Sequence, residues 1–94
     1  MREIVVSGNW WSSPDDLYDG LLSALRAPEW HGRNLDALWD SIATGHINEV
    51  EPPFRIRFVE VDALPDDCRA LLDRVIDLFA QAKEAGVLVE IEQP

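Results

Sequence analysis

Three short segments with the composition of β-strands are separated by stretches long enough to hold helices, and this spacing is the strongest constraint on the fold. The segments are residues 4–6, 54–59 and 87–91. Strands that are joined by helical crossovers run parallel within one sheet, and the connections between them are right-handed. The chain is therefore predicted to form an α/β fold in which a three-stranded parallel sheet packs against helices, in the order β-α-α-β-α-β.

The first of these segments is a run of β-branched residues followed by a turn-forming sequence, Ser7, Gly8 and Asn9. An uninterrupted apolar run is typical of a strand that is buried on both faces, so we expect this strand at the centre of the sheet. A helix over residues 14–26 is predicted next, because Ser13 suits the N-cap and a proline follows it. Its buried stripe is expected to contain Leu17, Leu21 and Leu25.

Two further helices are predicted from capping residues and periodicity. The second helix starts after Asn34, ends at Gly45, and has apolar residues at helical spacing: Leu35, Leu38, Trp39 and Ile42. The third begins at Pro65, ends before Gly86, and is expected to bury Leu71, Val75, Leu78, Phe79 and Ala82. The segment 54–59, which precedes the third helix, alternates apolar and basic residues and is predicted to be a half-exposed strand.

The net charge of −10 excludes two classes of ligand, because such a field repels phosphate backbones and anionic lipid headgroups. No run of about 18 apolar residues is present to span a bilayer, and the apolar run at the start is too short for a signal peptide. We therefore expect one cytoplasmic domain over residues 1–94, without cofactor or metal. The only cysteine, Cys68, is expected to be a buried and unreactive small hydrophobe.

Two carboxylates stand out on the second predicted helix. Asp36 and Asp40 lie four residues apart, on the flank away from the apolar stripe, so both are expected to face solvent. Like charges at this spacing repel, and no basic residue lies three or four positions from Asp40 on the same helix. Such a locally unfavourable arrangement indicates a function, because a partner can supply the missing positive charge.

Aromatic residues next to this helix have different expected roles. Trp30 lies on the preceding loop, where it is expected to add rigid contact area beside the two acids. Trp39 lies in the apolar stripe and is assigned mainly to the core. Of Trp10 and Trp11, one is expected to pack against a helix. Three other acids, Asp19, Asp73 and Asp77, lie on other predicted helices and are expected to contribute only to the long-range field.

The segment 28–45, which reads P-E-W-H-G-R-N-L-D-A-L-W-D-S-I-A-T-G, resembles the barstar family of ribonuclease inhibitors. The run N-L-D-A-L-W-D is its most specific part, and the F-x-x-A-K-x-x-G pattern that starts at Phe79 extends the similarity along the chain. The resemblance implies a partner-binding surface that is formed by Trp30, His31, Asn34, Asp36, Asp40, Thr44, Gly45, His46 and Gln81. His31 and His46 stand where aromatic residues are expected, and Gln81 stands where an acid is expected.

The resemblance implies that the protein is not an enzyme but an intracellular inhibitor of a secreted bacterial ribonuclease. The acidic helix and its preceding loop would block the active site in a one-to-one complex, and the free inhibitor is expected to be a monomer. An alternative is an immunity or binding module of the same fold for a different basic toxin or for a non-nuclease protein. The departures at His31, His46 and Gln81 leave this alternative open.

Two rival interpretations belong to other classes of site. A hydrolase could use Asp36 and Asp40 as acid and base, but two exposed acids on a short helix provide no pocket to differentiate them. A metal site could combine His31, Asp36, Asp40 and His46, but these residues lack a recognised ligand spacing. The sequence therefore favours a binding protein.

Overall fold

The computed structural model describes residues 1–92 and has the predicted order of elements. These are β1 (Arg2–Ser7), α1 (Pro14–Ala24), α2 (Leu35–Ala43), β2 (Phe54–Val59), α3 (Asp66–Glu84) and β3 (Val89–Glu92). The three strands form one parallel sheet, in which Ile4 of β1 is level with Ile56 of β2, and Ile56 with Ile91 of β3. The predicted α/β class and topology are confirmed. No helix within residues 1–92 is long and apolar enough to cross a membrane.

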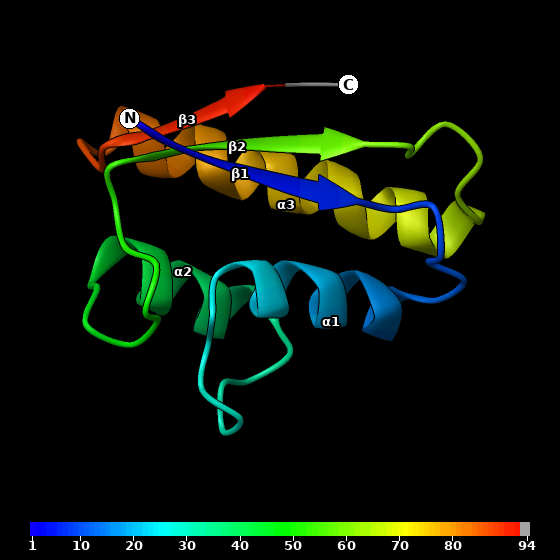
Figure 1. The fold of residues 1–94 in the computed structure, drawn as a ribbon, viewed down its shortest axis with the longest axis horizontal. Coiled ribbons are helices and arrows are strands. Elements are labelled where there is room, and N and C mark those ends of the chain that lie inside the picture. The colour runs from blue at the N-terminus through cyan, green and yellow to red at the C-terminus, as the bar shows by residue number, and fades with distance from the viewer. Residues whose placement is uncertain (93–94) are drawn as a thin grey trace.

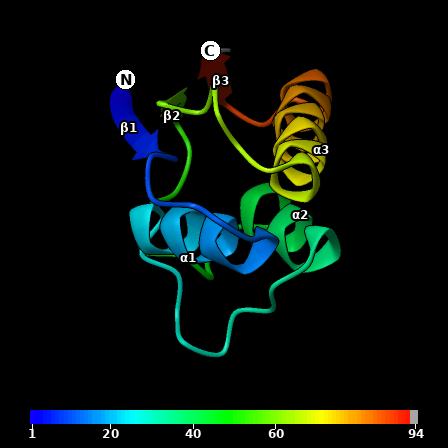
Figure 2. The same ribbon diagram turned by 90° about the vertical axis from the view of Figure 1, so that its right-hand side faces the viewer.

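The helices all lie on one side of the sheet, with α1 below β1 and α3 beside β3 (Figures 1 and 2). The inner face of the central strand β2 buries Phe54, Ile56 and Phe58. Its outer face carries Arg55 and Arg57, of which Arg55 is exposed and Arg57 is half-buried. The alternation predicted for this strand is therefore confirmed, because one face of the sheet has no helix on it.

The prediction that the first strand is central and buried on both faces is wrong. β1 is an edge strand, and β2 occupies the centre. Ile4 and Val6 point into the core, whereas Val5 between them is 48% exposed on the open face. Valine is as acceptable on the outer face of a strand as on the inner face, so three consecutive β-branched residues do not identify a central strand.

The core lies between the inner face of the sheet and the helices. Phe79 of α3 packs edge-to-face on Phe54 of β2, with ring centroids 6.2 Å apart. The buried stripe of α3 consists of Cys68, Leu72, Val75, Leu78, Phe79 and Ala82. The predicted stripe is corrected at its start, where Leu72 is fully buried and Leu71 is only partly buried. Leu71 lies on the flank of the helix, about 100° away from Leu72.

Helix termini are set by the residues that the sequence singles out. The side chain of Ser13 accepts a hydrogen bond from the Asp16 N–H, and Asn34 Oδ1 accepts one from the Ala37 N–H at 2.7 Å. Gly45 and Gly86, which follow α2 and α3, have φ angles of +79° and +95°. This left-handed conformation favours glycine and ends both helices.

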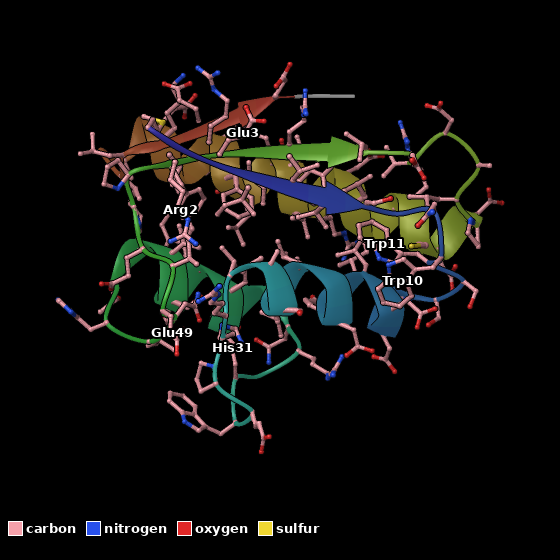
Figure 3. The ribbon with its side chains drawn as sticks, viewed as in Figure 1. Arg2, Glu3, Trp10, Trp11, His31 and Glu49 are labelled. Atoms are coloured by element: carbon pink, nitrogen blue, oxygen red, sulfur yellow. The ribbon has the colours of Figure 1, made fainter. Side chains whose placement is uncertain are left out.

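Trp10 and Trp11 of the first turn both lie against Gly20 of α1, but Trp11 is buried whereas Trp10 is half-exposed (Figure 3). A Cβ on Gly20 of α1 would lie 2.9 Å from the Trp11 indole nitrogen. Gly20 is therefore needed to let the Trp11 ring approach the backbone of α1.

We predict that the Cys68 thiol is unreactive while the protein is folded. The thiol is unpaired and buried, and burial together with the neighbouring Asp67 carboxylate raises its pKa, so the nucleophilic thiolate is scarce. A disulfide reagent at neutral pH should modify the native protein at least about tenfold more slowly than the urea-unfolded protein. Equal rates in the two states would show that the Cys68 site opens readily.

Candidate functional site

Helix α2 presents one polar side to solvent and buries the other. Asn34 caps its N-terminus, and its inner side buries Leu38, Ser41 and Ile42. The Ser41 hydroxyl donates a hydrogen bond to the Leu38 carbonyl at 3.0 Å, which satisfies this buried polar group. Because the apolar side of the helix faces the core, Asp36 and Asp40 are both exposed on its outer side, as predicted.

Neither of these two carboxylates is neutralised within the protein. No lysine, arginine or histidine nitrogen among residues 1–92 lies within 4.0 Å of an Asp36 or Asp40 carboxylate oxygen. The last turn of α2 also has no basic residue. The helix N-terminus favours Asp36, whereas Asp40 lies beyond the first turn and gains little from it. The structure therefore keeps the uncompensated pair that the spacing predicts.

The connection between α1 and α2 projects from the helices, away from the sheet (Figure 1). Trp30 on this connection is 74% exposed, the largest exposed fraction of any large apolar side chain among residues 1–92. It does not fold back over the core. Because an exposed indole is unfavourable in water, Trp30 is a candidate contact residue for another protein.

His31 differs from its neighbour, because it lies at the base of the connection and is buried (Figure 3). Its Nδ1 is 2.7 Å from the Gly32 carbonyl oxygen, and its backbone N–H donates a hydrogen bond to the Pro28 carbonyl at 3.0 Å. The expectation that His31 offers its ring to a partner is therefore not supported by its position. The His31 ring instead lies inside the protein, and the His31 backbone closes a turn with Pro28 in the segment that carries Trp30.

The segment after α2 brings three more of the predicted residues to the surface. Thr44 is the C-cap and is exposed, and Gly45 makes the left-handed turn. The His46 side chain is 92% exposed, while its backbone N–H donates a hydrogen bond to Glu51 Oε1. Thr44 and His46 therefore extend the exposed polar surface beyond Asp40, and Glu51 fixes the turn.

A cleft of about 320 Å³ separates α2 from α3, and it connects Gln81 to the acidic helix. It is lined by Leu35, Asp36, Trp39, Arg74, Asp77, Leu78 and Gln81. Trp39 is only half-buried, so it contributes to the core and also forms part of this cleft. Leu35 and Leu78 add further apolar lining, while the charged residues come from both helices.

Two residues of this cleft, Asp77 and Arg74, are not predicted from the sequence to belong to the binding surface. Asp77 was expected to act only through the long-range field, but it lines the same cleft as Asp36. The sequence pattern by itself gives Arg74 no role. The signal was present, since Arg74, Asp77 and Gln81 follow one another at spacings of three and four residues and so share one side of α3. What the sequence did not reveal is that this side faces α2.

A comparison with protein-family models gives a match over residues 1–92, to the family described as Barstar (barnase inhibitor). The chain belongs to the barstar family. A relative of it is the Bacillus subtilis (strain 168) protein named "Putative ribonuclease inhibitor YrdF", which is 42% identical over 48 residues. That alignment covers 51% of this chain and 52% of the relative, so it spans about half of each protein.

Members of the barstar family are inhibitors rather than enzymes. The site geometry agrees with a binding role, because Asp36 and Asp40 lie on an open helix surface and only Asp36 borders the cleft. Within residues 1–92, no group of three or more His, Cys, Asp or Glu side chains is arranged to hold a metal ion. What the surface offers is two free carboxylates on α2 and an exposed indole on the connection that precedes this helix.

Proposed function

We propose that this protein inhibits a basic, secreted ribonuclease by covering its active site in a one-to-one complex. The observation that carries the proposal is the uncompensated pair Asp36 and Asp40 on the exposed side of α2, together with the exposed Trp30 on the connection before this helix. Membership of the barstar family and the relative named as a ribonuclease inhibitor support it. The inhibition would take place in the cytoplasm, where a single unpaired cysteine such as Cys68 is usual.

The proposed mechanism is imitation of the substrate's charge. A ribonuclease presents basic side chains to the phosphates of RNA, and carboxylates form strong hydrogen bonds with the same groups. Asp36 and Asp40 would occupy this basic site without offering a bond that the nuclease can cleave. Attraction between the net charge of −10 and a basic nuclease would also accelerate the encounter.

The remaining surface residues would define the edge of the contact. Asn34 and Thr44 offer polar groups at the two ends of α2, and Gly45 offers its backbone. His46 projects from the following turn, and Gln81 contributes an uncharged amide across the cleft. His31 would act indirectly, by positioning the segment that carries Trp30.

Titration against a panel of small basic ribonucleases tests the proposal. We expect calorimetry to give one-to-one binding to at least one of them, loss of RNA hydrolysis by the bound nuclease, and no hydrolysis by the purified protein alone. Binding to none of the nucleases, or a complex that still cleaves RNA at full rate, would contradict inhibition. A complex with a basic protein that is not a nuclease would support the alternative function.

Trp30 should be important for binding and unimportant for folding. We expect Trp30→Ala to weaken the complex by about 2 kcal/mol, or roughly thirtyfold, because truncation of an aromatic anchor has this effect at interfaces. Its free energy of unfolding should change by less than about 0.5 kcal/mol, because the side chain is 74% exposed. Calorimetry and urea denaturation measure the two quantities.

The matched control is Trp10→Ala, which removes another tryptophan that is 53% exposed. Trp10 lies at the carboxyl end of β1, beside Gly20 of α1, and not on the α1–α2 connection (Figure 3). The control should bind like the unmodified protein. Equal weakening by both substitutions would mean that Trp30 has no special place in the complex.

A further inference from the structure

Arg74 is the positively charged residue in the lining of the cleft between α2 and α3, whose other lining residues are acidic or neutral. It lies on α3, is exposed, and lines the cleft that also contains Asp36, Trp39 and Gln81. Its charge also acts on the buried Tyr18 hydroxyl of α1, where it opposes the rise in pKa that burial causes. Arg74 therefore lies on α3 at the cleft that borders the proposed binding surface, and its charge also reaches Tyr18 of α1.

Within residues 1–92, most other basic residues form ion pairs, and Arg74 does not. Of the eight lysine and arginine side chains, five form ion pairs: Arg26, Arg33, Arg57, Arg69 and Lys83. The other two unpaired ones, Arg2 and Arg55, belong to strands of the sheet. Among residues 1–92, Arg74 is thus the one unpaired arginine or lysine that borders the proposed surface.

Two acidic residues lie in the same cleft as Arg74, and neither forms an ion pair with it. Asp36 and Asp77 line the same cleft, yet neither carboxylate lies within 4.0 Å of the guanidinium. Asp73, the adjacent residue, is paired with Arg69 at 3.7 Å. The five N–H donors of Arg74 are therefore free of carboxylate partners within residues 1–92, although two carboxylates border the cleft.

We propose that Arg74 is a specificity-determining residue that pairs with an acidic side chain of the partner nuclease. This inference rests on the proposed function, and it identifies a property of the partner: a carboxylate at the rim of its basic site, opposite α3. A nuclease with lysine or arginine at that point would be rejected, because like charges brought together at an interface are strongly unfavourable.

A specific ion pair at Arg74 and a general charge effect predict opposite changes in affinity when Arg74 is replaced by glutamate. If the inhibitor binds a basic nuclease only through overall charge, replacing arginine by glutamate makes the inhibitor more acidic and should strengthen binding. If Arg74 meets a carboxylate, the same replacement places two negative charges together and should weaken binding. The direction of the change therefore separates a specific pair from a general charge effect.

The experiment compares four variants by calorimetry, using the ribonuclease that binds the unmodified protein most tightly in the panel above. Arg74→Glu should lower the affinity about tenfold or more, Arg74→Ala should lower it less, and Arg74→Lys should retain most of it. Arg55→Glu makes the same change in charge on the open face of the sheet, and it should leave the affinity unchanged or raise it. Circular dichroism confirms that each variant is folded.

The outcomes distinguish failure of this inference from failure of the proposed function. Tighter or unchanged binding by Arg74→Glu, while Asp40→Ala weakens the complex, would overturn the role of Arg74 and leave the inhibitor surface standing. Unchanged inhibition by Asp40→Ala would overturn the proposed surface itself. If the unmodified protein binds no ribonuclease, both proposals fall together. If Arg74→Glu loses its fold, Arg74→Ala decides, since equal or tighter binding by that variant overturns the proposed pair.

Discussion

Replacement of Asp40 by alanine is expected to lower the affinity for the partner nuclease by about 2 to 5 kcal/mol, or roughly a thousandfold near the middle of that range. The reason is that the complex would bury the basic groups that Asp40 faces, and these groups would lose their counter-charge. Asp40 is exposed in the free protein and has no basic nitrogen within 4.0 Å among residues 1–92. Its carboxylate is therefore available for the partner.

The fold itself should tolerate Asp40→Ala. Removing one of two like charges at a spacing of four residues relieves repulsion within α2, so the free energy of unfolding should stay the same or rise slightly. Urea denaturation measures this free energy, and calorimetry measures the affinity. A folded variant with a large loss of affinity would assign the effect to the interface rather than to the stability of the inhibitor.

Asp62→Ala is the matched control. Asp62 is an exposed acid on the connection between β2 and α3, at the opposite end of the molecule from α2 (Figure 1). The Asp62→Ala substitution changes the net charge by the same amount as Asp40→Ala, so it should slow association with the nuclease slightly and in a salt-dependent way. If both variants stay folded and bind equally weakly, α2 has no specific role and only the overall charge matters.

The second large effect concerns stability. Phe79→Ala is expected to reduce the free energy of unfolding by about 3 to 5 kcal/mol, because it removes a large core side chain and leaves a cavity. Phe79 is fully buried, and its ring packs on Phe54 of the central strand. Domains of this size have a free energy of unfolding of only about 5 to 15 kcal/mol, so this substitution should remove a large part of it.

Leu88→Ala serves as the control for Phe79→Ala. Leu88 is also a large apolar residue, but it is 66% exposed, so its replacement should change the stability by less than about 0.5 kcal/mol. Urea denaturation at neutral pH compares the two variants. A loss below about 1 kcal/mol for Phe79→Ala would contradict the tight packing of this ring against Phe54 in the core.

Local features were predictable from the sequence because they depend on neighbouring residues. The caps at Ser13 and Asn34 and the left-handed glycines Gly45 and Gly86 all act within a few residues of a helix end. The spacing of apolar residues in α2 was also sufficient to predict that Asp36 and Asp40 are exposed, since the apolar stripe determines which side of a helix faces water.

Features that depend on the other elements were less predictable. The stripe of α3 was wrong at Leu71, because its exact rotation is set by the sheet and by α1 and α2 together. His31 was expected at the surface, since a histidine on a polar loop gives no local sign that its ring turns inward. The sequence pattern of β1 likewise does not show that a strand has a neighbour on one edge only.

By itself, the sequence determined the class of fold, the capping residues of the helices and the acidic face of α2, which follow from periodicity and capping. It favoured an exposed Trp30 because this residue lies on a loop. Only the tertiary structure decided the position of β1 at the edge and the meeting of α2 with α3. The physical reason is that strand order and helix docking depend on burial between distant segments, which local spacing does not encode. Asp77 and Arg74 join Asp36 in one cleft for that reason alone.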